Sequence, residues 1–526
     1  MKSFCTSSNN LIAMNKFILT FLLIGLAKLF AQIPEDAIKY SFFPQNGTAR
    51  SLSIGGAMGS LGGDITATFV NPAGLGNYKT GEFVFTPGFY FNNNKSNYRD
   101  TKFKSNKNNV GLGPIGFVFG YPNHYDATSS SAFSIAVSQV ANFNNSVQYK
   151  GYNNYSSYSE QWAEEISKSG ESIDGILSNP QYAYGSAPAL YTYLVDTFST
   201  NGEVQVRGLP EFLLSNGNSL YQEKNITTKG GMYEVAIGFA SNKKDKLLFG
   251  GSIGIPILNY KNITTFRESD TSGKLNNFDY LDYTDNFSTT GAGINLKLGL
   301  IYKPVEHIRL GLAVHTPTYM FAMKDKRNTR LEVNTEDYNG LATVSSGTFT
   351  NGADGESKYT MLTPWKFLVS GSYVFREIED VRKQKGFITA DIEYTGYKNT
   401  GFYSAVEAPT ADEEDYYKSL NKVIKSQYKG NFNFRAGGEL KFNVLMARLG
   451  FAYYTNPYKN AELKVRKMLV SGGIGYRHKG FFIDLTYVHA FNKDVDFAYR
   501  LSDKNNTFAS VNNQRGNLIA SVGVKF

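Results

Sequence analysis

Hydrophobic and polar residues alternate along many short stretches of this chain, from about residue 80 to its end. In the last ten residues, NLIASVGVKF, Leu518, Val522 and Phe526 fall on one face, and Ser521 and Lys525 fall on the other. The same alternation recurs in GNFNFRAGGELKFN, NLKLGLIYK, HIRLGLAVHT and FFIDLTYVHAF. A period of two residues is typical of β-strands that have one apolar face.

About fourteen such stretches can be placed, at 80–92, 109–121, 131–149, 230–241, 245–262, 286–303, 306–325, 359–376, 385–398, 430–443, 445–455, 466–478, 480–492 and 514–526. An even number of strands of roughly ten residues is typical of outer-membrane barrels. Closure of the barrel pairs every strand edge, which lipid cannot hydrate. Short turns near Val444 and Lys479 alternate with long connections at 150–229, 263–285 and 399–429. This pattern predicts an all-β fold, a 14-stranded antiparallel transmembrane β-barrel over residues 80–526.

A soluble, secreted β-sandwich or repeat protein would also alternate, with its apolar face packed into a core. Fourteen strands would then usually form several domains joined by linkers. The chain has no linker rich in Pro and Ser. We therefore favour the barrel.

The amino terminus has the features of a secretory signal peptide. Residues 17–27, FILTFLLIGLA, form a short apolar run that follows Lys16, and Ala31 is a plausible cleavage residue. We expect residues 1–31 to be removed, with Met1 or Met14 as the initiator. No later stretch approaches the roughly 20 apolar residues of a spanning helix, so any membrane span must be made by strands.

Composition excludes several classes of function. The chain has 54 Lys and Arg against 45 Asp and Glu, a dispersed charge of +9 that does not indicate a nucleic-acid surface. Its one cysteine, Cys5, lies in the predicted signal peptide, so the exported part has no thiol for a disulfide, a metal cluster or a nucleophile. The five histidines lack metal-ligand spacing. We expect no enzyme activity, no cofactor and no metal, although the sequence alone leaves an outer-membrane phospholipase open.

The segment before the first strand is small and rich in glycine. Residues 46–77 read NGTARSLSIGGAMGSLGGDITATFVNPAGLGN, which suits a compact plug inside the barrel. Its pieces ARSLSIGGA, Gly62-Gly63-Asp64 and Asn71-Pro72-Ala73-Gly74-Leu75 resemble the amino-terminal hatch of the FadL/TodX family of outer-membrane transporters for hydrophobic compounds. The predicted number of strands matches the 14-stranded barrel of that family.

The resemblance implies a hatch over residues 32–79 and a transport function. Members take up long-chain fatty acids or aromatic hydrocarbons, which external loops capture and pass to a pocket in the barrel. Release follows a shift of the hatch and can run sideways, where an inward kink in one strand breaks pairing. Asn71, Pro72, Ala73 and Gly74 are then candidate gate residues, since Pro72 fixes its own φ and restricts Asn71. The same residues could equally be a plain turn into the first strand.

The long connection 150–229 is a candidate capture loop. Ser186-Ala187-Pro188 predicts the start of a helix, on which Leu190, Tyr193, Leu194 and Phe198 would share one apolar face. Such a face could bind a hydrophobic ligand, or it could pack within the loop as a lid.

Charged residues on the predicted inner faces of the strands are further candidates for ligand binding. A fatty-acid carboxylate would need a cation in an apolar pocket, for which we name Arg309 and Arg435. The alternative for each is a wall charge that is solvated or paired with its neighbours.

These observations predict passive transport of a hydrophobic small molecule across the outer membrane of a Gram-negative cell by a monomer in outer-membrane lipid. The carboxy-terminal Phe526 resembles the signal that the barrel-assembly machinery reads. Two alternatives stay open, a FadL-like barrel that docks or shuttles secreted cargo and a general porin for polar solutes.

Overall fold

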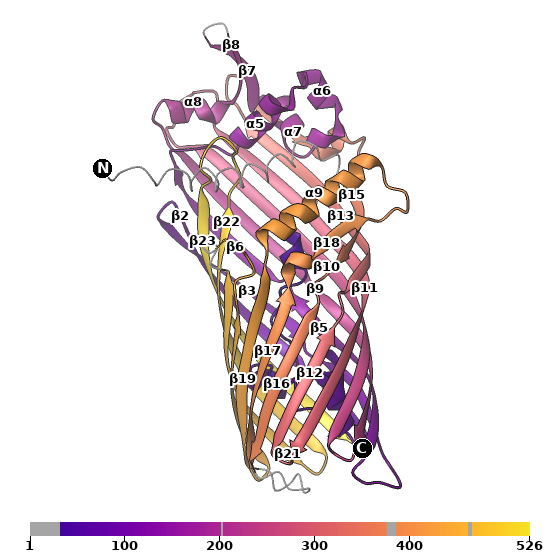
Figure 1. Cartoon of the computed structure of the whole chain (residues 1–526). Helices are drawn as coiled ribbons and strands as arrows, with labels where there is room; N and C mark the ends of the chain where they lie inside the picture. Colours follow the sequence, from indigo (N-terminus) through magenta and orange to yellow (C-terminus); the bar gives the residue numbers. More distant parts are fainter. Residues whose placement is uncertain (1–31, 201–202, 376–384, 461–464) are drawn as a thin grey trace, which may run out of the picture.

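The fold is a closed antiparallel β-barrel, drawn in Figure 1. The computed structural model describes residues 32–200, 203–375, 385–460 and 465–526, so the predicted signal peptide lies outside the described residues. The last strand pairs with the first along its length, for example Phe83 with Val524 and Phe91 with Gly516, which closes the wall. The prediction of a 14-stranded barrel is confirmed.

Several wall strands are interrupted and so consist of two labelled segments. In chain order the wall strands are β1 (Glu82–Phe85) with β2 (Pro87–Tyr98), β3 (Thr101–Leu112) with β4 (Ile115–Pro122), β5 (Ser130–Asn142) with β6 (Asn145–Asn153), β9 (Leu220–Lys243), β10 (Leu247–Asp270), β11 (Tyr280–Val305), β12 (Ile308–His315) with β13 (Tyr319–Asn334), β15 (Gly355–Leu362) with β16 (Lys366–Phe375), β17 (Gly386–Gly396) with β18 (Gly401–Ser404), β19 (Gly430–Phe442), β20 (Leu445–Tyr454), β21 (Arg466–His478), β22 (Phe481–Phe497) and β23 (Phe508–Lys525).

The remaining elements lie before the first strand or in the long connections. They are α2 (Asp36–Lys39), α3 (Ala49–Ser53), α4 (Ala67–Val70), η1 (Pro72–Asn77), α5 (Glu160–Ser169), α6 (Ile173–Ser178), η2 (Pro180–Tyr182), α7 (Ser186–Tyr191), β7 (Val195–Thr200), β8 (Glu203–Gly208), α8 (Leu209–Ser215), β14 (Leu341–Ser345), η3 (Ser346–Phe349), η5 (Tyr397–Asn399) and α9 (Ala411–Gln427). None of the described helices has the length and apolarity needed to cross a membrane.

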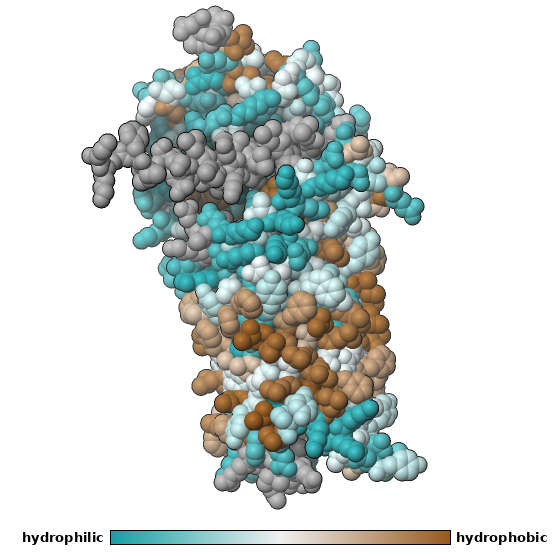
Figure 2. All heavy atoms as spheres, viewed as in Figure 1, coloured by the Kyte–Doolittle hydropathy of each residue, from teal (hydrophilic) through white to brown (hydrophobic). Residues whose placement is uncertain are grey.

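The outer face of the barrel carries the apolar residues of the alternating pattern. Phe434, Leu298 and Ile483 are each about two-fifths to one-half exposed, whereas their neighbours Arg435 and Asp484 are buried inside. Figure 2 shows a hydrophobic belt across the lower half of the barrel on the face in view. The belt is typical of a transmembrane barrel and argues against a soluble sandwich, in which this face would be covered.

The strands extend further than the hydropathy pattern predicts. The connection 263–285 is not one long loop, because β10 runs to Asp270 and pairs with β11 from Tyr280 onward. Beyond the belt both faces of a strand can carry polar groups, so the apolar alternation ends while the hydrogen-bond ladder continues.

The height of the wall differs around the barrel. Strands β9, β10 and β11 have 24, 24 and 26 residues, whereas β19, β20 and β21 have 13, 10 and 13. We call the short section made by β19–β21 the low wall. Helix α9 crosses the front of the barrel above it in Figure 1.

Candidate ligand-binding lumen

Residues 32–77 occupy the inside of the barrel. Three short helical segments, α3, α4 and η1, are almost entirely buried and contact the inner side chains of the wall. The hydroxyl of Thr48 caps α3 by accepting a hydrogen bond from Ser51 N. We call residues 32–77 the luminal segment.

Asn71 joins the luminal segment to the wall. Its side-chain amide donates to the Gly59 carbonyl at 2.6 Å and lies 3.3 Å from the carbonyls of Leu300 and Leu312, which belong to neighbouring strands. Its Oδ1 accepts from Ala73 N, so Asn71 also caps η1. Pro72, Ala73 and Gly74 are all buried in η1.

Close backbone approach explains part of the glycine content here. A Cβ on Gly299 of β11 would lie 1.8 Å from Asn71 Oδ1, and one on Gly450 of β20 would lie 2.0 Å from Gly55 N. These wall positions need glycine because the luminal segment lies directly against the strands.

Several inward charges are paired with one another. Arg435 lies 3.1 Å from Glu393 and 3.7 Å from Asp391, and its side chain is 1% exposed. Arg448 lies 2.5 Å from both Glu439 and Asp484. Arg435 is thus already paired with two carboxylates, and a ligand carboxylate would have to compete with them for it.

Arg309 contacts the luminal segment. Its guanidinium donates to the Leu61 carbonyl at 3.1 Å, while His315, further along the same strand, bonds to the Val70 carbonyl at 2.8 Å. Both residues therefore help to hold the luminal segment against β12.

An apolar cluster fills the lumen above these charges, and we call it the lumen cluster. It is rich in Tyr and Met and includes Met232, Leu258, Tyr260, Met320, Met323, Tyr359, Met361, Phe402, Tyr417, Leu420, Ile424, Tyr428 and Tyr454 from the wall and its loops. The luminal segment contributes Tyr40 and Phe42. Flexible Met and large aromatic side chains suit an adaptable apolar binding site.

Tyr40 lies at the centre of this cluster. Its ring packs edge-on against Phe143 and Tyr260, at 6.2 and 6.1 Å between ring centroids, and its hydroxyl donates to Thr289. The space that an apolar ligand would use is therefore filled by the chain's own aromatic side chains.

The wall is irregular where β5 meets β6. Below this point β4 and β5 pair regularly, with Ile115 opposite Val137. Above it, among the described residues, β3 forms a ladder with β2 but not with β6. Asn94 and Ser96 of β2 point inward and donate to the carbonyls of Ser146 and Gln148 on β6. Strand β6 therefore runs inside the β2–β3 hairpin, and we call this break the β3/β6 gap.

The β3/β6 gap adjoins the lumen cluster. Phe143, in the turn between β5 and β6, packs on Tyr40 and Tyr260. Across the gap Asn142 donates to Asn109 at 2.8 Å. Asn46 of the luminal segment bonds to the carbonyls of Leu112 and Gln139, which lie on either side of the break.

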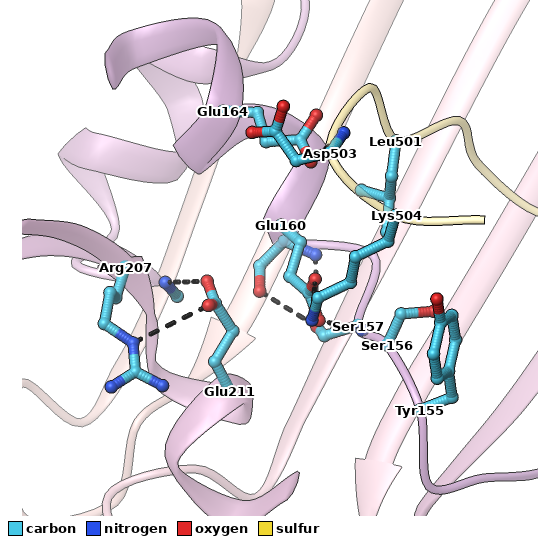
Figure 3. Close-up of polar contacts among 12 residues, drawn as sticks. Tyr155, Ser156, Ser157, Glu160, Glu164, Arg207, Glu211, Leu501, Asp503 and Lys504 are labelled. Carbon is cyan, nitrogen blue, oxygen red and sulfur yellow. Dashed lines mark hydrogen bonds and ion pairs between the residues drawn. The ribbon is translucent and has the colours of Figure 1, made fainter. Parts of the chain in front are cut away.

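A helical cap lies over the loop end of the barrel. Trp162 and Ile166 of α5, Leu190 of α7 and Leu213 of α8 pack against Phe266 and other residues of the strand ends. Figure 3 shows polar contacts that hold this cap, with Lys504 2.6 Å from Glu160 and Arg207 3.6 Å from Glu211.

A buried polar network also fixes the cap to the wall. Glu268 of β10, fully buried, accepts from Ser157 Oγ, Tyr158 N and Gln222 Nε2. Burial raises the pKa of the Glu165 carboxyl on α5, and the hydrogen bond from Ser186 opposes that shift.

The prediction that Leu190, Tyr193, Leu194 and Phe198 share one face of a helix is wrong. The helix does begin at Ser186, but it ends at Tyr191, and Tyr193 has a positive φ of 56°. Phe198 lies in strand β7. Leu190 and Leu194 are buried in the cap and Phe198 packs against the same cluster, whereas Tyr193 is 47% exposed, so the four residues form no common exposed face. The spacing was compatible with a longer helix, but the β7–β8 hairpin ends it.

Sequence reasoning missed helix α9 and the Tyr and Met residues of the lumen cluster. A signal for α9 was present, because Thr410 followed by acidic residues predicts a helix start and Tyr417, Leu420 and Ile424 recur at helical spacing. No comparable signal marked the cluster, since its members come from strands far apart in the chain.

Sequence comparisons give no match, either to a protein-family model or to a curated protein. Comparison with solved structures does give matches. The toluene transporter TodX of P. putida matches with a TM-score of 0.51 at 15% identity, over 92% of this chain and 99% of TodX. A FadL homologue of Pseudomonas aeruginosa matches with a TM-score of 0.53 at 12% identity, over 92% of this chain and 100% of its own.

The chain has the fold of these transporters. The closed wall, the apolar belt and the long loops at one end are typical of a barrel in the outer membrane. At this level of identity the comparison concerns architecture.

Proposed function

We propose that this protein is a passive outer-membrane channel for hydrophobic small molecules, of the kind carried by the FadL/TodX transporters that it resembles in fold. The observation that carries the proposal is the contact between the lumen cluster and the β3/β6 gap through Phe143. An apolar site that touches a break in a lipid-facing wall gives a hydrophobic molecule a path that avoids water.

In this mechanism the ligand replaces Tyr40 and Phe42 in the lumen cluster. The luminal segment then acts as the hatch, and a shift of its first residues frees the site. Asn46 couples that shift to the wall, because it bonds to carbonyls on both sides of the β3/β6 gap. The ligand leaves sideways into the membrane. Asn71, Pro72, Ala73 and Gly74, buried against β11 and β12, serve as the fixed base of the hatch.

Substrate class follows from the chemistry of the site. The cluster offers aromatic rings and thioethers. The cations beside it are already engaged: Lys39 pairs with Asp36, Lys467 donates to the Phe42 carbonyl at 2.6 Å, and Arg435 pairs with two carboxylates. This favours an aromatic hydrocarbon or the chain of a long fatty acid over a polar solute. Transfer runs down a gradient and requires no cofactor.

The test is uptake of radiolabelled toluene and of a labelled long-chain fatty acid by cells that express the protein in place of their own transporters. A second strain carries Asn109→Cys and Asn142→Cys, whose side chains meet across the β3/β6 gap. Both strains also carry Cys5→Ala. We expect uptake in the first strain and loss of uptake when the cysteine pair is bridged.

The matched control bridges Tyr121→Cys to Ser131→Cys, which face each other where β4 and β5 already pair. That bridge should leave uptake unchanged. Absence of uptake of both ligands in the unbridged strain would overturn the proposal. Conductance at the level of an open water-filled pore in a planar bilayer would instead favour a general porin, and stable co-purification of a protein cargo would favour a docking function.

A further inference from the structure

The wall next to the low wall has a line of strand interruptions, which a few backbone hydrogen bonds such as Thr363 N to Thr318 O still cross. Three consecutive strands are interrupted at the same height, at 316–318 between β12 and β13, at 363–365 between β15 and β16, and at 397–400 between β17 and β18. Two of these breaks contain a proline, Pro317 and Pro364, which has no backbone N–H to donate. At this level Thr318 N bonds to the Thr363 hydroxyl instead of a backbone carbonyl.

The line ends at a strand edge that a helix covers. The ladder between β17 and β19 stops at Gly396 and Gly430. Beyond it, among the described residues, β18 pairs with β15 on one side only. On the other side Asn421 of α9 takes the place of a strand, since its Oδ1 accepts from Phe402 N and its Nδ2 donates to Phe402 O, both at 2.8 Å.

Helix α9 separates the lumen cluster from the outside. Its apolar face, Tyr417, Leu420 and Ile424, is buried in the cluster beside Phe402. Its other face carries exposed charges such as Lys422 and Glu414. If the helix left this position, the lumen cluster would be exposed at the top of the low wall.

The luminal segment holds α9 from inside. The hydroxyl of Tyr416 donates to the Gln32 carbonyl at 2.8 Å, and that of Tyr428, which follows the helix, donates to the Pro34 carbonyl at 3.1 Å. Gln32 in turn donates to Asp325 on the wall. A shift of residues 32–34 therefore removes bonds that keep α9 in place.

The helix lies at the upper edge of the hydrophobic belt. Phe432, 52% exposed on the lipid side, is two residues from the top of β19. Trp365 and Tyr403 are also exposed on neighbouring strands, and such aromatic residues mark a membrane interface. Figure 2 shows a hydrophilic surface at the position of α9, above the belt and separated from it by a paler band.

We propose that α9 is the gate of a second lateral opening, through which a hydrocarbon dissolved in the outer leaflet reaches the lumen cluster. This inference rests on the proposed transport of hydrophobic molecules and adds an access route opposite the β3/β6 gap. Undocking of α9 exposes Met361 and Tyr359 to the membrane interface, and release of residues 32–34 favours that undocking.

The experiment uses the full-length protein with Cys5→Ala, reconstituted in vesicles that contain an alkyl diazirine in the lipid. Illumination attaches the probe to residues that it reaches, and mass spectrometry measures labelling of the peptide that contains Met361. The test variant adds Tyr403→Cys and Lys422→Cys, the neighbours of the Phe402–Asn421 contact, joined by a short bis-maleimide. We expect the peptide to be labelled before bridging and not after it.

The control carries Glu414→Cys and Lys418→Cys, which the same reagent bridges within α9 without fixing the helix to the wall. Labelling should then persist. Heat-modifiable migration on gels reports whether each barrel is folded. Equal labelling of the Met361 peptide with and without the 403–422 bridge would overturn the inference.

A single substitution gives an independent test that does not need the bridge. Asn421→Ala leaves both backbone groups of Phe402 without their partner on α9. The loss of one hydrogen-bonding side chain of ordinary strength should raise the population of undocked α9, and with it the labelling, about fivefold. Unchanged labelling would overturn the α9 gate. If the wild-type lumen is labelled at neither Met361 nor Phe143, the proposed transport itself fails, whereas labelling at Phe143 alone rejects only the α9 opening.

Discussion

The two irregular regions of the wall are closed in different ways. At the β3/β6 gap a strand moves inward, and polar side chains of β2 bond to its carbonyls. At the low wall the strands stop early and an amphipathic helix covers the edge. The first closure consists of many small polar contacts, whereas the second combines one large buried apolar face with the Asn421–Phe402 hydrogen bonds. The luminal segment touches both, through Asn46 and through Gln32.

Because of this difference, we expect the free energies of the two closures to respond differently to substitutions. Side chain-to-backbone hydrogen bonds each contribute modestly, so the β3/β6 gap should respond to substitutions in small steps. Burial of an apolar helix face is lost as a unit, so the closure of the low wall should respond sharply to one large-to-small change.

Loss of Arg435 should have the largest effect. Arg435→Ala leaves Asp391 and Glu393 buried without their cation, which should destabilise the barrel by about 3–5 kcal/mol and weaken the base of the low wall most. The measurement is the temperature at which heat-modifiable migration is lost. Arg330→Ala is the control, because Arg330 is more than half exposed and the loss of its pair with Glu332 should cost under about 1 kcal/mol. Equal effects of the two substitutions would contradict this assignment.

Truncation of the buried face of α9 should open the low wall alone. Ile424 is fully buried, and Ile424→Ala should weaken the docking of α9 by about 2–4 kcal/mol through lost packing. Hydrogen exchange should accelerate in 411–427 and stay unchanged in β6. Lys422→Ala, on the exposed face, serves as the matched control. Faster exchange in β6 as well would show that the two closures are one cooperative unit.

A change at the β3/β6 gap should be smaller. Asn94 donates to Ser146 O and Asn145 Oδ1, so Asn94→Ala should cost about 1–2 kcal/mol and speed exchange in β6 only. Asn93→Ala on the same strand, where the side chain points outward, should change nothing. An effect on α9 as large as that on β6 would reject the separation.

The stability of the cap, which lies apart from both regions, should depend weakly on pH. Because burial raises the pKa of Glu165 above its ordinary value of 4.5, the cap is most stable below that value and loses stability as pH rises through the folded-state pKa. Faster hydrogen exchange in α5 and α7 at higher pH, corrected for the intrinsic rate, would report it. Glu165→Gln should abolish the trend, and persistence of the trend in that variant would assign it to another group.

Several features followed from sequence, and the reasons are local. Lipid requires an apolar residue at every second position, so Phe434, Leu298 and Ile483 predicted the outer face correctly. The start of a helix at Ser186 was also correct because Pro188 stands in its first turn. Its length was wrong because a later hairpin, and not the helix pattern, decides where Leu194 and Phe198 lie.

Sequence by itself determined that this chain forms a lipid-facing barrel of fourteen strands, because the period of two is imposed residue by residue by the solvent on either side of the wall. Only the tertiary structure decided how the inside is used. The partners of Arg435, the inward course of β6 and the docking of Asn421 on Phe402 join residues from separate strands and loops. No local pattern distinguishes an inward side chain that faces water from one that meets another segment, since that depends on which strands closure brings together.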